Sequence, residues 1–288
     1  MNDLNIGIVG LGYVGSAIRH AYEVQELSDR LFTYDIDDSK NPSCQSLSEL
    51  VSNADLIYVS VPTPMKSNGE CDISIIERVV EEVCQSNIRK IIVIKSTVVP
   101  GTTERLQASY PFHSIFFCPE FLTEANYLED YLHQDIMLLG IPRNAHYVLG
   151  NAVLQEQLSV SEVKYSDIVD ATTAEFYKYV ANIFLATKVS FANEMENIAK
   201  EIGINWNDIA GIVENDKRLG KSHWKVPGPD GHRGFGGTCF PKDINALIAY
   251  AQSLNIQTPL LKAVWKRNVL VDRPERDWEE LKGRAVSE

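Results

Sequence analysis

Short hydrophobic runs alternate with longer mixed segments along the first half of the chain. The runs are rich in β-branched residues and lie at residues 6–10, 31–35, 56–62, 90–98, 114–118 and 136–141. Runs of this length predict buried strands, and helical stretches between them are typical of a doubly wound parallel sheet. We therefore expect an α/β domain over residues 1–165.

A helical pattern follows, because residues 168–202 contain no proline and read as one long helix. Several apolar side chains recur in it at helical spacing, which predicts that they face the core. They are Phe176, Val180, Ile183, Phe184 and Phe191. Lys178 and Asn182 lie one turn apart on roughly the opposite side.

Two other segments of the second half differ in composition. Residues 218–241 hold many glycines and prolines, and an ordered loop of this length is commonly a binding loop. Residues 271–288 are highly charged, which predicts a solvated tail. We expect a smaller all-helical domain over residues 166–270 and a charged C-terminal tail after it.

The overall composition excludes several classes of protein. Hydrophobic residues make up 44% and charged residues 23%, a balance typical of a folded globular protein. A formal charge of -12 without a basic stretch disfavours nucleic-acid binding. The amino terminus lacks a signal-peptide pattern, and no apolar run approaches the roughly 20 residues that cross a bilayer. We expect neither export nor a membrane span.

The cysteine and histidine patterns indicate a cytoplasmic protein without a metal site. Five cysteines, an odd number without paired spacing, fit free thiols in a reducing compartment. The six histidines show neither an H-x-x-H nor an H-E-x-x-H spacing. One of the cysteines remains a candidate for chemistry.

A glycine motif follows the first predicted strand. Gly10, Gly12 and Gly15 are spaced to allow a tight turn, a close approach to a pyrophosphate and helix-strand packing. Asp35 closes the second strand about twenty residues later, where a carboxylate can accept hydrogen bonds from the ribose hydroxyls of NAD. A 2′-phosphate would meet this charge, which disfavours NADP. We therefore expect a Rossmann-type NAD site; the plain alternative is a glycine turn needed only for packing.

One cysteine lies between a glycine run and a predicted helix. The segment reads Gly234-Phe235-Gly236-Gly237-Thr238-Cys239-Phe240-Pro241-Lys242-Asp243. A cysteine at a helix amino terminus beside a lysine tends to be a reactive thiolate, so Cys239 is the candidate nucleophile. The plain alternative is a small buried apolar side chain, which we assign to Cys44, Cys71, Cys84 and Cys118.

Two glutamates follow the fifth predicted strand, at the end where ligands bind in open α/β sheets. Glu120 and Glu124 are candidate bases, because Phe121 and Leu122 between them are apolar. Lys178 and Asn182 supply a cation and an amide suited to stabilising an oxyanion. A salt-bridged surface is the alternative for this second pair.

With these residues in place, the chain resembles the UDP-glucose/GDP-mannose 6-dehydrogenase family. The glycine motif and the Cys239 segment occur in family order with several further motifs. These are Val61-Pro62-Thr63-Pro64, Lys95-Ser96-Thr97 with Pro100-Gly101-Thr102, Pro119-Glu120-Phe121-Leu122 with Glu124, and Lys178 with Asn182. The resemblance spans roughly residues 5–270, and the Gly-Gly-x-Cys-Phe-Pro-Lys-Asp segment is its most specific part.

The resemblance implies a four-electron oxidation of the C6 alcohol of a UDP- or GDP-hexose by two NAD molecules, foremost UDP-glucose to UDP-glucuronate in polysaccharide biosynthesis. It implies a thiohemiacetal and then a thioester on Cys239, and hydrolysis assisted by Glu120. Thr97 and Asp243 would hold water, and Lys178 and Asn182 would stabilise the oxyanion. Implied cofactor contacts are Gly10, Gly12, Tyr13, Val14, Gly15, Asp35, Val61, Pro62, Thr63, Thr97, Glu124 and Lys242. Implied substrate contacts are Glu120, Phe121, Leu122, Lys178, Asn182, Arg218, Lys225 and Gly236.

The resemblance also implies a homodimer through the long helix, with Arg218 reaching the partner's substrate. The chain departs from the family in stopping soon after the helical domain, where members usually carry a further nucleotide-binding unit. The loop over residues 224–233 is longer than usual, and we expect Lys225, His232 or Arg233 to bind a diphosphate in partial compensation. Thr123 and Ala125 replace a common arginine and a frequent glycine.

Two other functions stay open. A β-hydroxyacid dehydrogenase is similarly short and uses a Lys-x-x-x-Asn pair on a long helix, but it needs no cysteine nucleophile. It would form one NADH for each substrate rather than two. A non-catalytic subunit that binds nucleotide sugars would form none.

Overall fold

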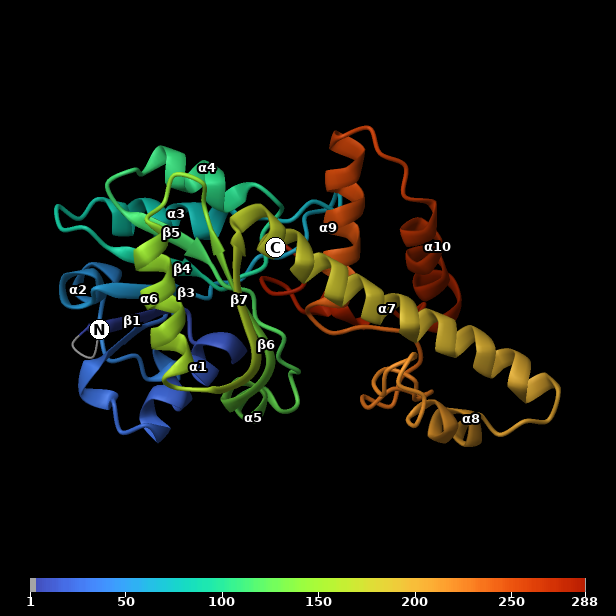
Figure 1. Ribbon diagram of the computed structural model, residues 1–288. Helices are drawn as coiled ribbons and strands as arrows, with labels where there is room; N and C mark the ends of the chain where they lie inside the picture. Colours follow the sequence, from blue (N-terminus) through green and yellow to red (C-terminus); the bar gives the residue numbers. More distant parts are fainter. Residues whose placement is uncertain (1–3, 288) are drawn as a thin grey trace. The chain divides into compact units, whose positions relative to one another are not determined.

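The chain divides into two compact units in the computed structural model, which describes residues 4–287 (Figure 1). Unit 1 comprises Met1–Thr63 and Ile73–Lys178, and unit 2 comprises Pro64–Asp72 and Tyr179–Glu288. The helix α7 (Ala171–Glu201) contributes to both units. The division therefore falls inside this helix, later in the chain than the boundary expected at residue 165.

Unit 1 is built on a seven-stranded sheet with the order β2-β1-β3-β4-β5-β6-β7. The strands are β1 (Ile6–Val9), β2 (Leu31–Tyr34), β3 (Leu56–Val59), β4 (Ile91–Ile94), β5 (Ser114–Phe117), β6 (His133–Ile141) and β7 (Glu162–Asp170). The first five strands are parallel, β6 runs antiparallel to β5, and β7 runs parallel to β6. The expected Rossmann-type sheet is confirmed, with one antiparallel pairing added.

Six helices cover the two faces of this sheet: α1 (Tyr13–Val24), α2 (Leu47–Asn53), α3 (Ser74–Cys84), α4 (Thr102–Ser109), α5 (Tyr127–Leu132) and α6 (Tyr147–Leu158). Alternate strand residues face opposite ways. Ile8 and Tyr58 pack with side chains of α1, α5 and α6. Ile57 and Val59 pack with side chains of α2, α3 and α4. Both faces of the sheet are buried, which explains the continuous apolar runs in the sequence.

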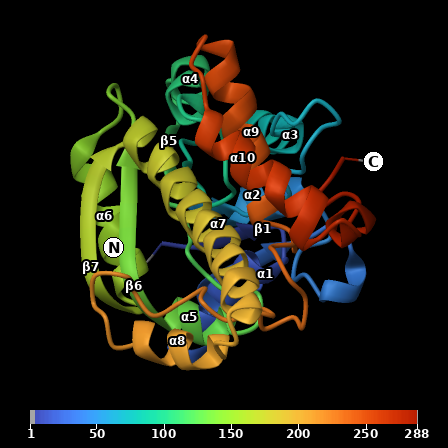
Figure 2. The same cartoon turned by 90° about the vertical axis from the view of Figure 1, so that its right-hand side faces the viewer.

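Unit 2 is helical and consists of most of α7, α8 (Trp206–Val213), α9 (Phe240–Ser253) and α10 (Pro259–Arg267), followed by the π-helical turn η3 (Asn268–Asp272) and the 3-10 turn η4 (Asp277–Glu280). Helices α9 and α10 pack against α7 through Ile244, Val264 and Tyr179 (Figure 2). A second cluster joins α8 to Trp224. No helix within residues 4–287 is both long and apolar enough to span a bilayer.

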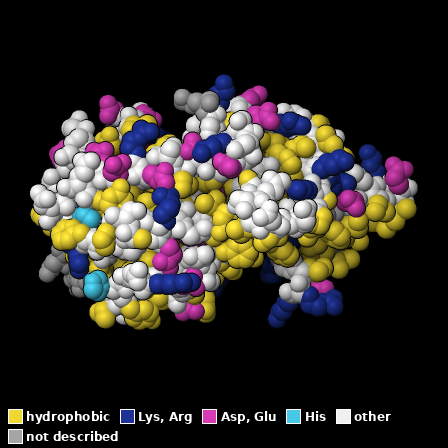
Figure 3. Space-filling view, turned by 90° about the horizontal axis from the view of Figure 1, so that it is seen from above, with side chains coloured by type: hydrophobic (Ala, Val, Ile, Leu, Met, Phe, Trp, Pro, Cys, Tyr) yellow, Lys and Arg dark blue, Asp and Glu magenta, His cyan; other side chains and the backbone are white. Residues whose placement is uncertain are grey.

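The prediction for the faces of α7 is wrong for four of its five apolar residues. Phe176, Val180, Phe184 and Phe191 are between 44% and 62% exposed, and only Ile183 is buried. Lys178 and Asn182 are buried instead. Helical spacing shows which residues share a side, but it does not show which side packs inward. Hydrophobic side chains gather accordingly on the surface of the helical unit (Figure 3).

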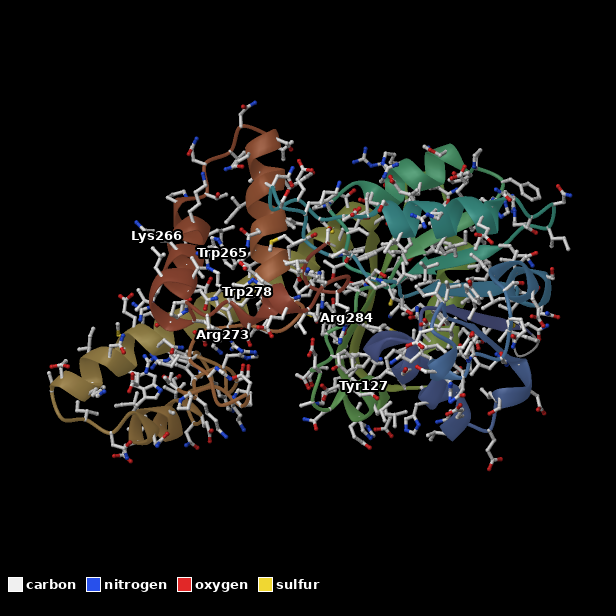
Figure 4. All side chains as sticks on the ribbon, turned by 180° about the vertical axis from the view of Figure 1, so that it is seen from behind. Tyr127, Trp265, Lys266, Arg273, Trp278 and Arg284 are labelled. Carbon is white, nitrogen blue, oxygen red and sulfur yellow. The ribbon has the colours of Figure 1, made fainter. Side chains whose placement is uncertain are left out.

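The prediction of a solvated tail after residue 270 is also wrong. Arg273, Trp278 and Ala285 are almost fully buried, and the rings of Trp278 and Trp265 lie 5.6 Å apart (Figure 4). The backbone N–H of Met65 donates to the carbonyl of Ala285 over 2.9 Å. Charged residues of this segment pair both within it, as Arg273 does with Asp277, and with earlier residues, as Arg273 does with Asp230. Its few apolar residues anchor it, and composition alone does not reveal such pairing.

Candidate active site

The three motif glycines lie in the turn between β1 and α1, and two of them are required by packing. At Gly10, where φ is +90°, an added Cβ would lie 2.7 Å from the carbonyl oxygen of Ser60. At Gly15, an added Cβ would lie 1.8 Å from the carbonyl oxygen of Gly10. At Gly12 an added Cβ would meet no atom within 4 Å. Gly12 therefore leaves open space above the turn, as the approach of a pyrophosphate requires. Tyr13 and Val14 form the first turn of α1.

Asp35 follows β2 and is tied to the same turn. Its Oδ2 accepts a hydrogen bond from the backbone N–H of Leu11 over 2.6 Å, and its Oδ1 accepts one from Asp37 over 2.9 Å. The carboxylate is therefore fixed beside the glycine turn, where ribose hydroxyls can donate to it and a 2′-phosphate would be repelled. These residues fit NAD.

The loops after β3 and β4 lie at the same edge of the sheet, because β1, β3, β4 and β5 are parallel. Val61, Pro62 and Thr63 come from the first loop and Thr97 from the second. The Ser96 hydroxyl donates to the carbonyl of Val61 over 2.7 Å, which joins the two loops. The predicted cofactor residues of unit 1 thus share the edge at which ligands bind in open α/β sheets.

Glu120, after β5, is paired with Lys178 of α7. The Lys178 ammonium lies 3.2 Å from Glu120 Oε1, donates also to the Glu120 carbonyl, and lies 5.2 Å from the ring centroid of Phe121. Glu120 Oε2 accepts from the backbone N–H of Leu122 over 2.7 Å. The side chains of the pair are only 4% and 13% exposed. The pair of Lys178 and Glu120 is therefore not a solvated surface salt bridge. Glu124, the second candidate base, is exposed.

Glu175, one turn before Lys178, is a residue that the sequence analysis missed. Its carboxylate accepts hydrogen bonds from the backbone N–H groups of Gly101 and Thr103 over 2.6 and 2.8 Å, and from the Thr103 hydroxyl over 2.6 Å. Burial raises the pKa of Glu175 to about 7, although these hydrogen bonds act to lower it. Glu175 thus caps the start of α4 and, within unit 1, joins the first turns of α7 to that helix. A single glutamate in a helical pattern gave no signal of this.

In unit 2, Cys239 directly precedes α9, and Pro241 lies in the first turn of that helix. Lys242 and Asp243 follow, and the Lys242 ammonium lies 2.5 Å from Asp243 Oδ1. The Asn182 amide of α7 donates to Asp243 Oδ2 over 2.6 Å. The Asp243 carboxylate is therefore buried and held from two sides.

Lys242 is the cation beside the candidate nucleophile. Burial by itself lowers the pKa of Lys242, but Asp243 and the sulfurs of Cys239 and Cys71 raise it above its ordinary range. Lys242 therefore stays protonated, and a fixed cation near the sulfur of Cys239 favours its thiolate. Cys71 was predicted as a plain apolar residue, and no spacing in the sequence connects it with Lys242.

The residues expected to bind the outer parts of a substrate are dispersed. Arg218 is 87% exposed at its side chain and is held by both carboxylate oxygens of Asp216, at 2.9 and 2.6 Å. Arg233 donates to Glu196 over 2.6 Å and to Asn197 over 2.7 Å. Arg233 thus has partners within unit 2, and its expected contact with a diphosphate stays a prediction. Lys225 is exposed.

Among residues 4–287, no three or more His, Cys, Asp or Glu side chains are grouped so as to hold a metal ion. Nδ1 of His232, a residue expected to help bind a diphosphate, lies 3.4 Å from Oε1 of Glu275.

Comparisons with known proteins show the family of the chain. Residues 40–157 match the NAD binding domain of the UDP-glucose/GDP-mannose dehydrogenase family, and residues 172–269 match its central domain. The UDP-glucose 6-dehydrogenase of Rickettsia conorii is 36% identical over 224 residues, which are 76% of this chain and 50% of the relative. The chain thus spans about half the length of that relative.

Two further similarities cover nearly the whole chain. The UDP-glucose 6-dehydrogenase of Rickettsia bellii is 30% identical over an alignment of 324 residues, which covers 99% of this chain and 72% of the relative. Among solved structures, a UDP-glucose dehydrogenase from the hyperthermophilic archaeon Pyrobaculum islandicum is similar with a TM-score of 0.80 at 28% identity. That similarity covers 92% of this chain and 68% of the other.

Proposed function

Because the chain belongs to the UDP-glucose/GDP-mannose dehydrogenase family, we propose that it oxidises the C6 primary alcohol of a nucleotide sugar to a carboxylate with two NAD molecules. The observation that carries the proposal is the position of Cys239 at the start of α9, close to the Lys242 cation. UDP-glucose, which would give UDP-glucuronate, is the substrate to test first, since both Rickettsia relatives carry its name.

The glycine turn and Asp35 would hold the cofactor in unit 1, with Tyr13 and Val14 beside the pyrophosphate. Bound NAD accepts the hydride that leaves C6. Val61, Pro62, Thr63, Thr97 and Glu124 would line the nicotinamide end. The overall balance takes one alcohol, two NAD⁺ and one water to one carboxylate, two NADH and three protons.

Cys239 would carry the intermediate. Loss of the first hydride leaves an aldehyde, and the thiolate adds to its carbon to form a thiohemiacetal. Loss of the second hydride gives a thioester, which water hydrolyses with the thiolate as leaving group. The Lys242 cation favours the thiolate at both the attacking and the leaving stage.

Five polar groups would serve the oxygen atoms of the reaction. Lys178 and the Asn182 amide would stabilise the developing oxyanion. Glu120 would take the proton from the attacking water, because Lys178 and the Leu122 N–H hold its carboxylate in one orientation. Asp243 would orient that water together with Thr97. Phe121, Leu122, Gly236, Arg218 and Lys225 would contact the rest of the substrate.

A panel of UDP- and GDP-hexoses with NAD tests the proposal. We expect two NADH for each substrate consumed, and a product whose mass corresponds to the C6 acid. One NADH with a ketone product would indicate a β-hydroxyacid dehydrogenase instead. A folded protein that binds nucleotide sugars and forms no NADH would identify a non-catalytic binding subunit.

We also propose that the exposed apolar side of α7 forms a homodimer. Phe176, Val180, Phe184 and Phe191 lie on that side and are about half exposed in the single chain. Exposed aromatic side chains in a contiguous row are typical of subunit interfaces. Arg218, which extends from unit 2 into solvent, would reach the substrate of the partner. The five free cysteines fit a cytoplasmic reaction.

A further inference from the structure

The glycine run before Cys239 rests on buried side chains of the C-terminal segment. Asn268 is fully buried, and its amide both accepts from the backbone N–H of Phe235 and donates to the Phe235 carbonyl, each over 2.8 Å. An added Cβ at Gly234, where φ is +65°, would lie 2.4 Å from Asn268 Oδ1. The turn η3 therefore holds the first half of the run directly.

Arg273, immediately after η3, is fixed by two carboxylates. Its Nε and Nη2 donate to the two oxygens of Asp277 over 2.7 and 2.6 Å, and its Nη1 donates to Asp230 over 2.6 Å. The side chain of Arg273 is only 3% exposed. A planar guanidinium held at three of its nitrogens by two carboxylates has little freedom to move.

The plane of this guanidinium lies directly against Gly236. An added Cβ at Gly236 would lie 2.5 Å from Cζ of Arg273 and 2.7 Å from Nη2. Gly237 follows with φ at +70°, and Cys239 lies two residues later, directly before α9. The backbone that leads into Cys239 is therefore shaped over Arg273, and Asp230 anchors the turn that precedes it.

We propose that Arg273 is a positioning residue for Cys239. Its guanidinium sets the path of Gly236 and Gly237, and through them the place of the sulfur at the start of α9. The inference rests on the proposed function, because it makes the step in which Cys239 adds to the aldehyde depend on the position that Arg273 gives to Cys239. The first hydride leaves before a bond to sulfur forms, so only the second oxidation depends on Arg273.

Arg273→Lys tests this, because it keeps the charge and removes the planar fork. Its control is Arg276→Lys, three residues further on, whose side chain is 44% exposed and pairs with Glu279. Single-turnover measurements with UDP-glucose should show the first NADH at the wild-type rate. Formation of the second NADH should be about 100-fold slower, the effect expected when a reacting atom such as the Cys239 sulfur is displaced by about 1 Å. An aldehyde should accumulate that hydroxylamine traps.

The alkylation rate of Cys239 by iodoacetamide, followed by mass spectrometry, gives a readout without substrate. We expect the alkylation rate to change at least several-fold in Arg273→Lys. In Asp230→Asn, which removes one of the two carboxylates that hold Arg273, the rate should change in the same direction but less. The Arg276→Lys control should alkylate like the wild type. The urea midpoint should stay close to wild type, since Asn268 and Trp278 remain in place.

Wild-type alkylation and a wild-type second NADH in Arg273→Lys would overturn the inference. So would an equal loss of both NADH phases together with a lower urea midpoint, which would show a merely structural role. If the wild-type protein forms no NADH, or if Cys239→Ser still forms two, the proposed function fails. The alkylation rates would still decide whether Arg273 positions the sulfur.

Discussion

Replacing Glu175 with glutamine should change how the stability of the protein depends on pH. Glu175 is fully buried, and burial raises the pKa of its carboxyl from the ordinary 4.5 to about 7. Between these values the folded chain keeps a proton that the unfolded chain has lost, so stability falls as pH rises. This difference between the two pKa values corresponds to about 3 kcal/mol of folding stability. The contribution is fully present below about pH 4.5 and is lost as pH rises through about 7.

Urea unfolding followed by circular dichroism between pH 4 and pH 8 measures this contribution. Glu175→Gln keeps the shape of the side chain and has no proton to lose. Its free energy of unfolding relative to wild type should therefore rise by about 3 kcal/mol from pH 4 to pH 8. Glu201→Gln, at an exposed position of the same helix, is the control and should show no such trend. A difference that stays constant across this range would refute the reasoning.

Three further predictions follow from the packing. Gly12→Ala should fold like the wild type but bind NAD more weakly in calorimetry. Gly15→Ala places a Cβ only 1.8 Å from the Gly10 carbonyl oxygen and should therefore lower the melting temperature. Equal behaviour of the two variants would contradict the roles assigned to the two glycines. Phe184→Glu should convert the proposed dimer to a monomer in light scattering. An unchanged mass would remove α7 from the interface. Trp278→Ala should cost about 3 to 5 kcal/mol in urea unfolding, and a loss near zero would restore the solvated tail.

The sheet could be predicted from the sequence because both of its faces are covered. Buried parallel strands read as continuous β-branched runs, and this signal located β1 to β6. The strand β7 was missed because it lies at the edge of the sheet. Its residues Glu162, Lys164 and Asp167 are exposed, so no apolar run marks it. Edge strands carry such charges because charges prevent pairing with other chains.

The candidate site could be predicted where backbone geometry restricts the residue type. Gly10 and Gly15 are required by contacts at 2.7 and 1.8 Å, and Asp35 by its hydrogen bond to the same turn. Glu175 could not be found in this way, because its partners Gly101 and Thr103 lie 74 and 72 residues away in the chain. Arg273 pairs with the nearby Asp277, but its contacts with Asp230 and Gly236 join distant parts of the chain. Charged residues that pair across such separations look like solvated residues in a sequence.

The position of the polar side chains of α7 shows the same limit. Lys178 and Asn182 are buried because Glu120 and Asp243 satisfy them, and burying such groups without these partners would be costly. Hydrophobic periodicity weighs only apolar side chains, so it assigned the opposite side of the helix to the core. The apolar side is exposed in the single chain instead, and we propose it as the interface of a homodimer.

The mass of the protein quenched with acid during a single turnover tests the central claim, that Cys239 carries the intermediate. Glu120→Gln should slow hydrolysis, so that UDP-glucose with NAD leaves a substrate-derived acyl group on the peptide that contains Cys239. The same treatment of a Cys239→Ser, Glu120→Gln double variant should leave no such thioester. An unmodified Cys239 in every quenched sample, while the C6 acid accumulates at the wild-type rate, would contradict the account.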